Sequence, residues 1–379
     1  MEIKIKVVKN QRDLKKFITF PEQLYKGNKY WVPSLLSDEL FTLSKILNPA
    51  FKHCQAEYFL AYKGDEIVGR VAGIINNNAN EDWNLKTVRF GWIDFIDDIE
   101  VTKALINAVC QWGKEKGMTE LRGPLGFSDM DKEGLLIEGF CRLPSITTIY
   151  NFPYYAEHFE KLGLKKDVDW VQNTFILPDV VPEKLHHYSN VIMERYGLKL
   201  YRPKSTKELK KRGHEIFTVF NVAYSSLYEF TRLNQAQIRT YVNQYLPMIN
   251  KDLICLITDK NDKIVAFAIT MPSMSIAMRK AKGRIFPLGF WHLLRALRKM
   301  DTLELLLIGI MPEYHNKGLN SIIFDYLHSN SIKYGVKQVI SNPQLEHNTA
   351  VQSLFYHYPT EPYQRRRAYE AKLEDIMDK

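Results

Sequence analysis

The segment 303–327 constrains the fold of this chain more than any other, because it joins a buried type of strand to a helix through a short polar turn. A mostly apolar run extends from Leu303 to Met311, and Pro312, which cannot continue a ladder of strand hydrogen bonds, ends it. Beyond Gly318 the apolar positions recur at helical spacing, which predicts a helix. The first N–H groups of a helix lack intrahelical acceptors and carry partial positive charge. We therefore expect the turn to bind a phosphate or pyrophosphate.

Other predicted elements surround this segment in a definite order. They are helices at 205–223 and 234–249, hairpin strands at 252–259 and 263–270, a strand at 337–342, a short helix at 348–356 and a last strand at 367–373. The hairpin turn is Lys260-Asn261-Asp262. The sequence thus predicts this order of elements: a hairpin, a strand, a phosphate loop, a helix, a strand, a helix and a strand.

The turn His315-Asn316-Lys317-Gly318-Leu319-Asn320, in this order of elements, resembles the acyl-CoA loop of the GNAT (Gcn5-related N-acetyltransferase) superfamily, which usually has Gln/Arg-x-x-Gly-x-Gly/Ala. His315 replaces the usual Gln or Arg, and Asn320 replaces the final small residue. The resemblance covers roughly residues 195–375. It implies an α+β domain in which a central mixed, mostly antiparallel sheet is flanked by helices.

The first half of the chain repeats this theme without the loop. Its predicted elements are hairpin strands at 56–62 and 67–75, a strand at 88–95, a helix at 99–116 and a strand at 119–124. Residues 154–164 resemble the family's usual Tyr-Glu-Lys-Leu-Gly-Phe helix ending, whereas 96–100 carries acids that would repel phosphate. We expect a GNAT-like domain without the usual CoA loop at 1–180 and a second with the loop at 315–320 within 181–379. The whole chain resembles bacterial proteins with two GNAT-like domains in tandem.

The resemblance implies an acyl-CoA site in the second domain. The loop would hold the pyrophosphate, and the backbone at 308–310 would bond the pantetheine and polarise the thioester carbonyl. Asn348 matches an Asn that often starts the last helix, where it could act simply as an N-cap. The residues expected to bind the cofactor are Ile308, Gly309, Ile310, His315, Asn316, Lys317, Gly318, Leu319, Asn320, Ser321 and Asn348.

Acyl transfer to an amine needs a base, oxyanion donors and an acid for the leaving thiolate. Glu304 is the candidate base, because it lies where histone-type members of the superfamily carry a glutamate on this strand. The alternative is an edge or surface glutamate in a solvated ion pair. Counting from Asn348 puts Phe355 at the position of the family's tyrosine acid. Tyr356, about 100° further round the helix, is the candidate acid, and a packed aromatic side chain is the alternative.

Length and composition agree with two domains. A chain of 379 residues can bury two sizeable cores, and no apolar run is long enough to span a bilayer. The four cysteines lie far apart without Cys-x-x-Cys spacing, so neither a zinc site nor a disulfide framework is expected, and no metal cofactor is predicted. The cytoplasm is the expected location.

Basic charge is concentrated in the second half. Residues 1–180 hold 23 Lys/Arg and 25 Asp/Glu, whereas residues 181–379 hold 29 and 18. The segment 278–300 combines apolar and basic residues and has no acid before Asp301. It could contact CoA phosphates, an acidic carrier protein, tRNA or a membrane surface, or form a solvated helix face packed over the sheet.

These features favour an N-acyltransferase that moves an acyl group, with acetyl the first expectation, from acyl-CoA to a small-molecule or peptide amine. A transferase that uses aminoacyl-tRNA, as in the tandem GNAT-like Fem ligases, draws on the same basic half. A non-catalytic sensor or scaffold for acyl thioesters is the alternative that His315, Asn320 and Phe355 favour. The amine acceptor does not follow from the sequence, because acceptor pockets are built from loops.

Overall fold

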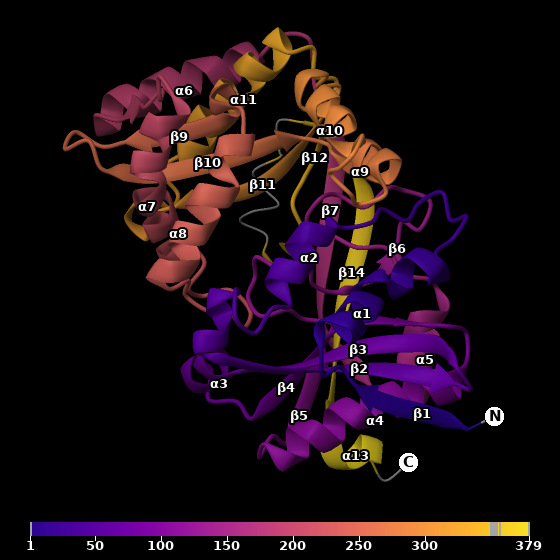
Figure 1. Ribbon diagram of the computed structural model, residues 1–379. Helices are drawn as coiled ribbons and strands as arrows, with labels where there is room; N and C mark the ends of the chain where they lie inside the picture. The colour runs from indigo at the N-terminus through magenta and orange to yellow at the C-terminus, as the bar shows by residue number, and fades with distance from the viewer. Residues whose placement is uncertain (1, 349–354, 356–357, 378–379) are drawn as a thin grey trace. The chain divides into compact units, whose positions relative to one another are not determined.

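The computed structural model describes residues 2–348, 355 and 358–377 (Figure 1). The chain divides into two compact units. Unit 1 comprises Met1–Val171, Ser275–Leu293 and Gln364–Lys379, and unit 2 comprises Gln172–Met274 and Leu294–Tyr363. None of the described helices is long and apolar enough to cross a membrane.

Unit 1 is a mixed sheet with helices. Its strands are β1 (Ile3–Val7), β2 (Cys54–Lys63), β3 (Glu66–Asn76), β4 (Thr87–Phe95), β5 (Glu120–Gly123), β6 (Leu135–Glu138), the first part of β7 (Lys165–Ile176) and the end of β14 (Thr360–Lys372). Its helices are α1 (Gln11–Leu24), α2 (Leu36–Thr42), α3 (Asn77–Asp82), α4 (Ile99–Glu115), α5 (Tyr154–Leu162), α9 (Ser275–Ala281) and α13 (Leu373–Met377). Strands β1, β2, β3, β4, β5 and β14 are neighbours in this order, and all pairs are antiparallel except β4 with β5.

Unit 2 repeats this arrangement. Its strands are the end of β7, β8 (Lys199–Leu200), β9 (Ile254–Thr258), β10 (Ile264–Pro272), β11 (Thr302–Ile310), β12 (Gln338–Ile340), β13 (Gln344–Leu345) and the start of β14. Its helices are α6 (Glu183–Tyr196), α7 (Thr206–Ala223), α8 (Gln235–Gln244) and α11 (Leu319–Lys333), and α10 (Gly289–Arg298) runs from unit 1 into unit 2. Strands β8, β9, β10, β11, β12 and β7 are neighbours, and β11 with β12 is the parallel pair.

The helices of unit 2 begin where the sequence supplies caps. Ser205 accepts the Glu208 N–H before α7, and Asn234 and Gln237 form a capping box before α8. Figure 1 shows α6 and α11 on one side of the unit 2 strands and α7 and α8 on the other. Leu185 of α6 and Ile322 and Ile323 of α11 share a buried cluster with Cys255 and Ile257 of β9.

Each unit takes one strand from the opposite half of the sequence. The C-terminal part of β14 pairs with β5, with Tyr369 opposite Gly123, and Gln338–Ile340 of β12 pairs with the end of β7. Burial supports this exchange, because Tyr369 and Leu373 belong to the core of unit 1 and Phe175 to that of unit 2. The compact units therefore do not follow a single cut between residues 180 and 181.

Candidate functional site

Strand β11 parts from its parallel neighbour after Glu304 and then carries a bulge. Ile269 of β10 lies opposite Leu307 and Thr270 opposite Leu305, so Leu306 is the extra residue. Pairing with β12 covers only Thr302–Glu304, opposite Gln338–Ile340. Among the described residues, no strand pairs with the β12 side of β11 beyond Glu304. Polar backbone groups at the end of this edge are thus placed to bond an extended ligand.

The predicted pyrophosphate loop follows directly. Pro312–Tyr314 form one 3₁₀ turn, and His315 and Ile310 are joined by a hydrogen bond of 3.1 Å between Nε2 and the carbonyl oxygen. Asn316 and Gly318 have left-handed backbones, with φ of 58° and 78°. Gly318 is the N-cap of α11, and none of the side chains that the structure describes caps this helix end. The N–H groups of Leu319 and Asn320 in its first turn are therefore left for solvent or an anion.

Two features of its surroundings favour glycine at position 318. Its positive φ strains any residue with a Cβ, and a Cβ built there would lie 2.5 Å from Cδ1 of Ile192 on α6. Lys317 places its ammonium group 5.3 Å from the ring centre of Tyr196 and 5.0 Å from that of Tyr314. These rings hold a cation beside the N-terminus of α11, which adds to the positive charge there.

The remaining loop residues surround this helix end. Leu319 is buried in the core of unit 2, whereas Ser321 N–H donates to the Gly318 carbonyl at 2.9 Å. Asn320 is half-buried, and its Oδ1 atom is buried without a hydrogen-bond partner among the described residues. An unsatisfied buried acceptor costs about 1–3 kcal/mol. A ligand that donates a hydrogen bond at this position would recover that energy.

Glu304 is buried inside the sheet. Its exposed fraction is 1 %, and it lies opposite Met271 of β10 and Ile340 of β12, at the last pair before β11 and β12 separate. The alternative of a solvated surface glutamate is therefore wrong. A carboxylate at the start of the opened edge can exchange a proton with a group bound there.

The structure does not describe Tyr356, so its proposed role as acid stays a prediction. Asn348 is half-buried and immediately precedes residues outside the described range, so its place at the start of a helix is untested as well. Phe355, which the sequence count puts at the family's tyrosine position, is 3 % exposed and packs with ring centres 5.7 Å from Phe175 and 5.6 Å from Phe324. Phe355 is thus a core residue.

Sequence reasoning missed one buried tyrosine next to this position. The Tyr358 hydroxyl lies 3.0 Å from Nδ1 of His328, and Nε2 of His328 lies 2.7 Å from the Pro178 carbonyl. Burial lowers the pKa of His328 and raises that of Tyr358. The neutral imidazole donates through Nε2 and accepts the phenol proton at Nδ1. Tyr358 therefore directs its proton into the core.

Strand β4 of unit 1 has the same geometry as β11, but side chains of unit 1 form hydrogen bonds with the backbone at its end. Thr87–Arg89 of β4 pair with β5, and Trp92 has a φ of 44° at the β4 bulge. Beyond the bulge, Phe95 N–H donates to the Tyr155 hydroxyl at 3.0 Å, and the Tyr154 hydroxyl donates to the Phe95 carbonyl at 2.6 Å. The backbone that would bond a pantetheine therefore already has partners.

The helix that follows β4 is also capped internally. Asp98 accepts the Glu100 N–H at 3.1 Å and pairs with Lys63 Nζ at 3.1 Å. The hydrogen bond from Lys63 holds the pKa of Asp98 below its usual value. A carboxylate thus occupies the α4 end where a phosphate would lie, in agreement with the acids noted in the sequence.

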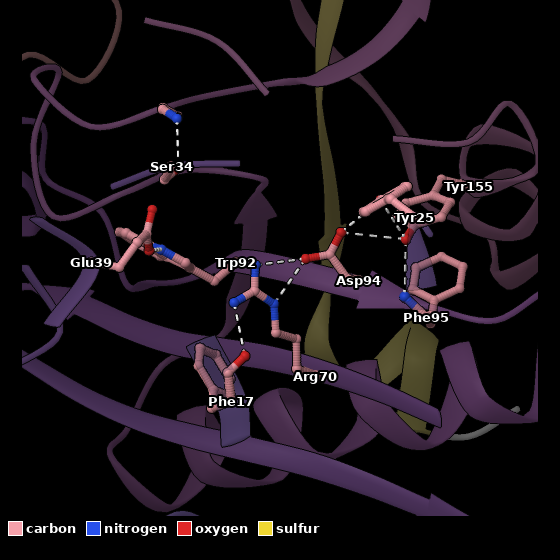
Figure 2. A network of polar contacts seen from close by, with 10 residues as sticks. Phe17, Tyr25, Ser34, Glu39, Arg70, Trp92, Asp94, Phe95 and Tyr155 are labelled. Atoms are coloured by element: carbon pink, nitrogen blue, oxygen red, sulfur yellow. Dashed lines mark hydrogen bonds and ion pairs between the residues drawn. The ribbon is translucent and has the colours of Figure 1, made fainter. Parts of the chain in front are cut away.

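A buried polar network lies beside this filled edge (Figure 2). Asp94 accepts from Arg70 Nε at 2.8 Å and from the Tyr25 hydroxyl at 2.7 Å, and the Tyr25 and Tyr155 hydroxyls are 3.0 Å apart. Arg70 also donates to the Phe17 carbonyl at 2.9 Å. Burial raises the pKa of Asp94, an effect that Arg70 opposes. The network joins α1, β3, β4 and α5. Its one sign in the sequence is the charged residue Asp94 in a mostly apolar strand.

No family model matches this sequence. The chain is 28% identical over 374 residues to Protein YghO of Escherichia coli (strain K12), which covers 96% of this chain and 94% of that protein. It is 23% identical over 316 residues to Bacterial ceramide synthase of Caulobacter vibrioides, covering 81% and 80%. A solved tandem GNAT protein from the clavulanic acid biosynthesis pathway aligns with a TM-score of 0.55 at 11% identity, over 98% of this chain and 99% of that one. The chain therefore has the tandem GNAT fold, which confirms the predicted fold class.

Proposed function

We propose that this protein is an N-acyltransferase that moves an acyl group from acyl-CoA to an amine, with the donor bound in unit 2. The observation that carries the proposal is the coincidence of two features in one segment. Within the described part of the chain, the β12 side of β11 has no strand partner beyond Glu304, and the next helix begins at Gly318 without a side-chain cap. The first suits an extended pantetheine arm, and the second suits a pyrophosphate.

Each residue of this segment has a role in the proposed reaction. The N–H groups of residues 318–320 and the Lys317 cation would hold the pyrophosphate, and the backbone at 308–310 would hold the pantetheine and stabilise the oxyanion. Glu304 would take the proton from the attacking amine, directly or through a water molecule. The acyl–sulfur bond breaks as the amide forms, and Tyr356 is the candidate that protonates the thiolate.

Unit 1 would serve a different purpose, because its corresponding edge and helix end are occupied by Tyr154, Tyr155 and Asp98. We propose that it binds no CoA.

A longer donor and a lipid acceptor form a second version of this proposal. The likeness to Bacterial ceramide synthase, over four-fifths of each chain, favours it. A ceramide is an amide between a fatty acyl group and a long-chain amino alcohol, so its formation is the same N-acyl transfer. We therefore extend the candidate acceptors to long-chain amino alcohols.

The test is a release assay for free CoA with acetyl-CoA and palmitoyl-CoA, each with a panel of amino acids, polyamines, peptides and a sphingoid base. Mass spectrometry then identifies the amide. We expect CoA release that depends on an amine and yields its N-acyl product. If acyl-CoA binds but no product forms with any amine, the non-catalytic alternative holds. If transfer occurs only from aminoacyl-tRNA, the donor is misassigned.

A further inference from the structure

A stretch of unit 1 that the acyl-transfer chemistry does not use exposes large apolar side chains. In the segment formed by α9, the turn 282–288 and the start of α10, the exposed fractions are 60 % for Ile276, 77 % for Phe286, 67 % for Leu288 and 63 % for Trp291. The Phe286 and Phe290 ring centres are 6.1 Å apart, and those of Phe290 and Trp291 are 4.9 Å apart. Apolar side chains gathered on a surface mark an interaction site.

The backbone beneath these side chains is anchored in unit 1. Ser275 donates to the Pro144 carbonyl at 2.6 Å, and the Gly283 carbonyl accepts the Leu36 N–H at 2.9 Å. Arg284 pairs with both carboxylate oxygens of Glu22, at 2.9 and 3.0 Å. The exposed side chains are thus held outward on a supported segment, while Ala277, Met278 and Ala281 are buried beneath it.

The charge of the segment has one sign. No Asp or Glu occurs between Met274 and Asp301, whereas seven Lys or Arg residues do. Arg284 forms an ion pair with Glu22, and Nζ of Lys299 lies 3.9 Å from Oδ2 of Asp301. Lys280 and Lys282 are exposed among the apolar side chains. Along α10, Leu294, Arg295 and Arg298 follow Trp291 at three, four and seven residues, so they share its helix face and are also exposed.

We infer that this apolar and basic surface, which we call the 276–291 patch, docks the protein onto an anionic lipid membrane. Apolar side chains that enter the boundary between headgroups and acyl chains, with lysines and arginines at the headgroups, are the pattern of interfacial membrane binding. Nucleic acid is the competing partner, because it also attracts basic residues. However, Ile276 and Leu288 offer a nucleic acid no ring for base stacking, whereas lipid takes aliphatic and aromatic side chains alike. Membrane binding rests on residues other than those of the proposed acyl-CoA site, and it holds whether or not acyl transfer occurs.

The experiment measures binding of the full-length protein to vesicles of phosphatidylcholine alone and of phosphatidylcholine with about a quarter of phosphatidylglycerol, by flotation. We expect binding to the anionic vesicles that weakens with salt, and a blue shift of tryptophan fluorescence that Trp291→Phe abolishes without preventing binding. The double variants Lys280→Glu/Lys282→Glu and Phe286→Ser/Leu288→Ser should each weaken binding roughly tenfold or more.

Matched controls change the same kinds of side chain elsewhere. Lys4→Glu/Lys15→Glu makes the same charge change at exposed lysines, and Ile176→Ser/Val180→Ser removes apolar side chains with exposed fractions of 66 % and 74 %. Both controls should bind within about twofold of wild type. Equal losses in the controls, or no binding to anionic vesicles, would overturn the proposal. Binding to RNA or to an acidic protein that the lysine variant loses and the serine variant keeps, without vesicle binding, would replace it with that partner.

Discussion

At the scale of single residues, Glu304 is the candidate base whose role is most directly testable. It is a buried carboxylate at the last β11–β12 pair before the strands separate. If it is the base, Glu304→Gln keeps the shape of the side chain but cannot accept the ammonium proton. We expect kcat to fall by about a hundredfold to ten-thousandfold, with acyl-CoA affinity retained.

Glu313→Gln is the matched control for this measurement, because Glu313 is an exposed glutamate of the neighbouring 3₁₀ turn. Steady-state kinetics for the control should equal those of wild type. A Glu304→Gln enzyme with full kcat would show that another group takes the proton.

Asp131 gives a pH-dependent prediction. Burial raises the pKa of its carboxyl to about 7, although Phe127 N–H and Ser128 N–H donate to it. The folded protein therefore holds a proton that the unfolded chain releases at lower pH, so the contribution of this group to stability is lost as pH rises toward 7. The expected loss in the free energy of unfolding between pH 4 and 8 is roughly 2–4 kcal/mol.

Asp131→Asn should remove most of this pH dependence, because an amide oxygen can still accept the two N–H groups but carries no charge. Asp65→Asn, at an exposed turn between β2 and β3, should leave it unchanged. Urea denaturation across this pH range measures the free energy of unfolding of both variants. Identical pH profiles for wild type and Asp131→Asn would contradict the raised pKa.

At the scale of elements, β4 and β11 have the same strand geometry but different surroundings. Both carry a bulge and both pair in parallel for only three residues. In unit 1, tyrosines of α5 reach the strand end, and Asp98 caps the helix. In unit 2, Gly318 leaves the helix end uncapped. The difference lies in a few side chains rather than in the backbone.

The hydrogen bonds of the Tyr155 hydroxyl should stabilise unit 1 without affecting the donor site. Tyr155→Phe leaves the buried Phe95 N–H and the Tyr25 hydroxyl without this partner, which should lower the free energy of unfolding by about 1–3 kcal/mol. Tyr188→Phe, at a half-exposed position of α6, should change it by less than about 0.5 kcal/mol. Urea denaturation gives both values. An equally stable Tyr155→Phe variant would mean that these hydrogen bonds do not contribute to the free energy of unfolding.

At the scale of the whole molecule, the strand exchange binds the two halves of the sequence to each other. Residues 1–180 alone lack β14 and α13, which supply Tyr369, Leu373 and Ile376 to the unit 1 core. Residues 181–379 alone lack the part of β7 that pairs with β12. We expect neither fragment to unfold cooperatively, because each leaves a sheet edge and a core face exposed. Thermal unfolding followed by circular dichroism tests this, and a sharp transition in the isolated 1–180 fragment would contradict it.

The sequence predicted the fold class and the strand–loop–helix segment around Gly318, because the periodicity and the Pro and Gly positions are local signals. It did not predict the exchange of β14 and β7, since strand pairing across about 200 residues leaves no local pattern. The burial of Glu304 and the hydroxyl contacts of Tyr154 and Tyr155 also depend on which elements pack together. The loop was therefore predictable, whereas the surroundings of its chemical groups were not.

The measurement that tests the central claim most directly is calorimetric titration of acetyl-CoA and palmitoyl-CoA into wild type, Gly318→Trp and Gly335→Trp. Gly335 also has a positive φ, of 71°, but follows the other end of α11, where a Cβ meets nothing within 4 Å. The two variants thus impose similar backbone strain, but they differ in location, and only the side chain at position 318 also displaces Ile192. We predict that wild type and Gly335→Trp bind acyl-CoA and that Gly318→Trp, while folded by circular dichroism, does not. Undiminished binding by Gly318→Trp would place the donor elsewhere and contradict the account.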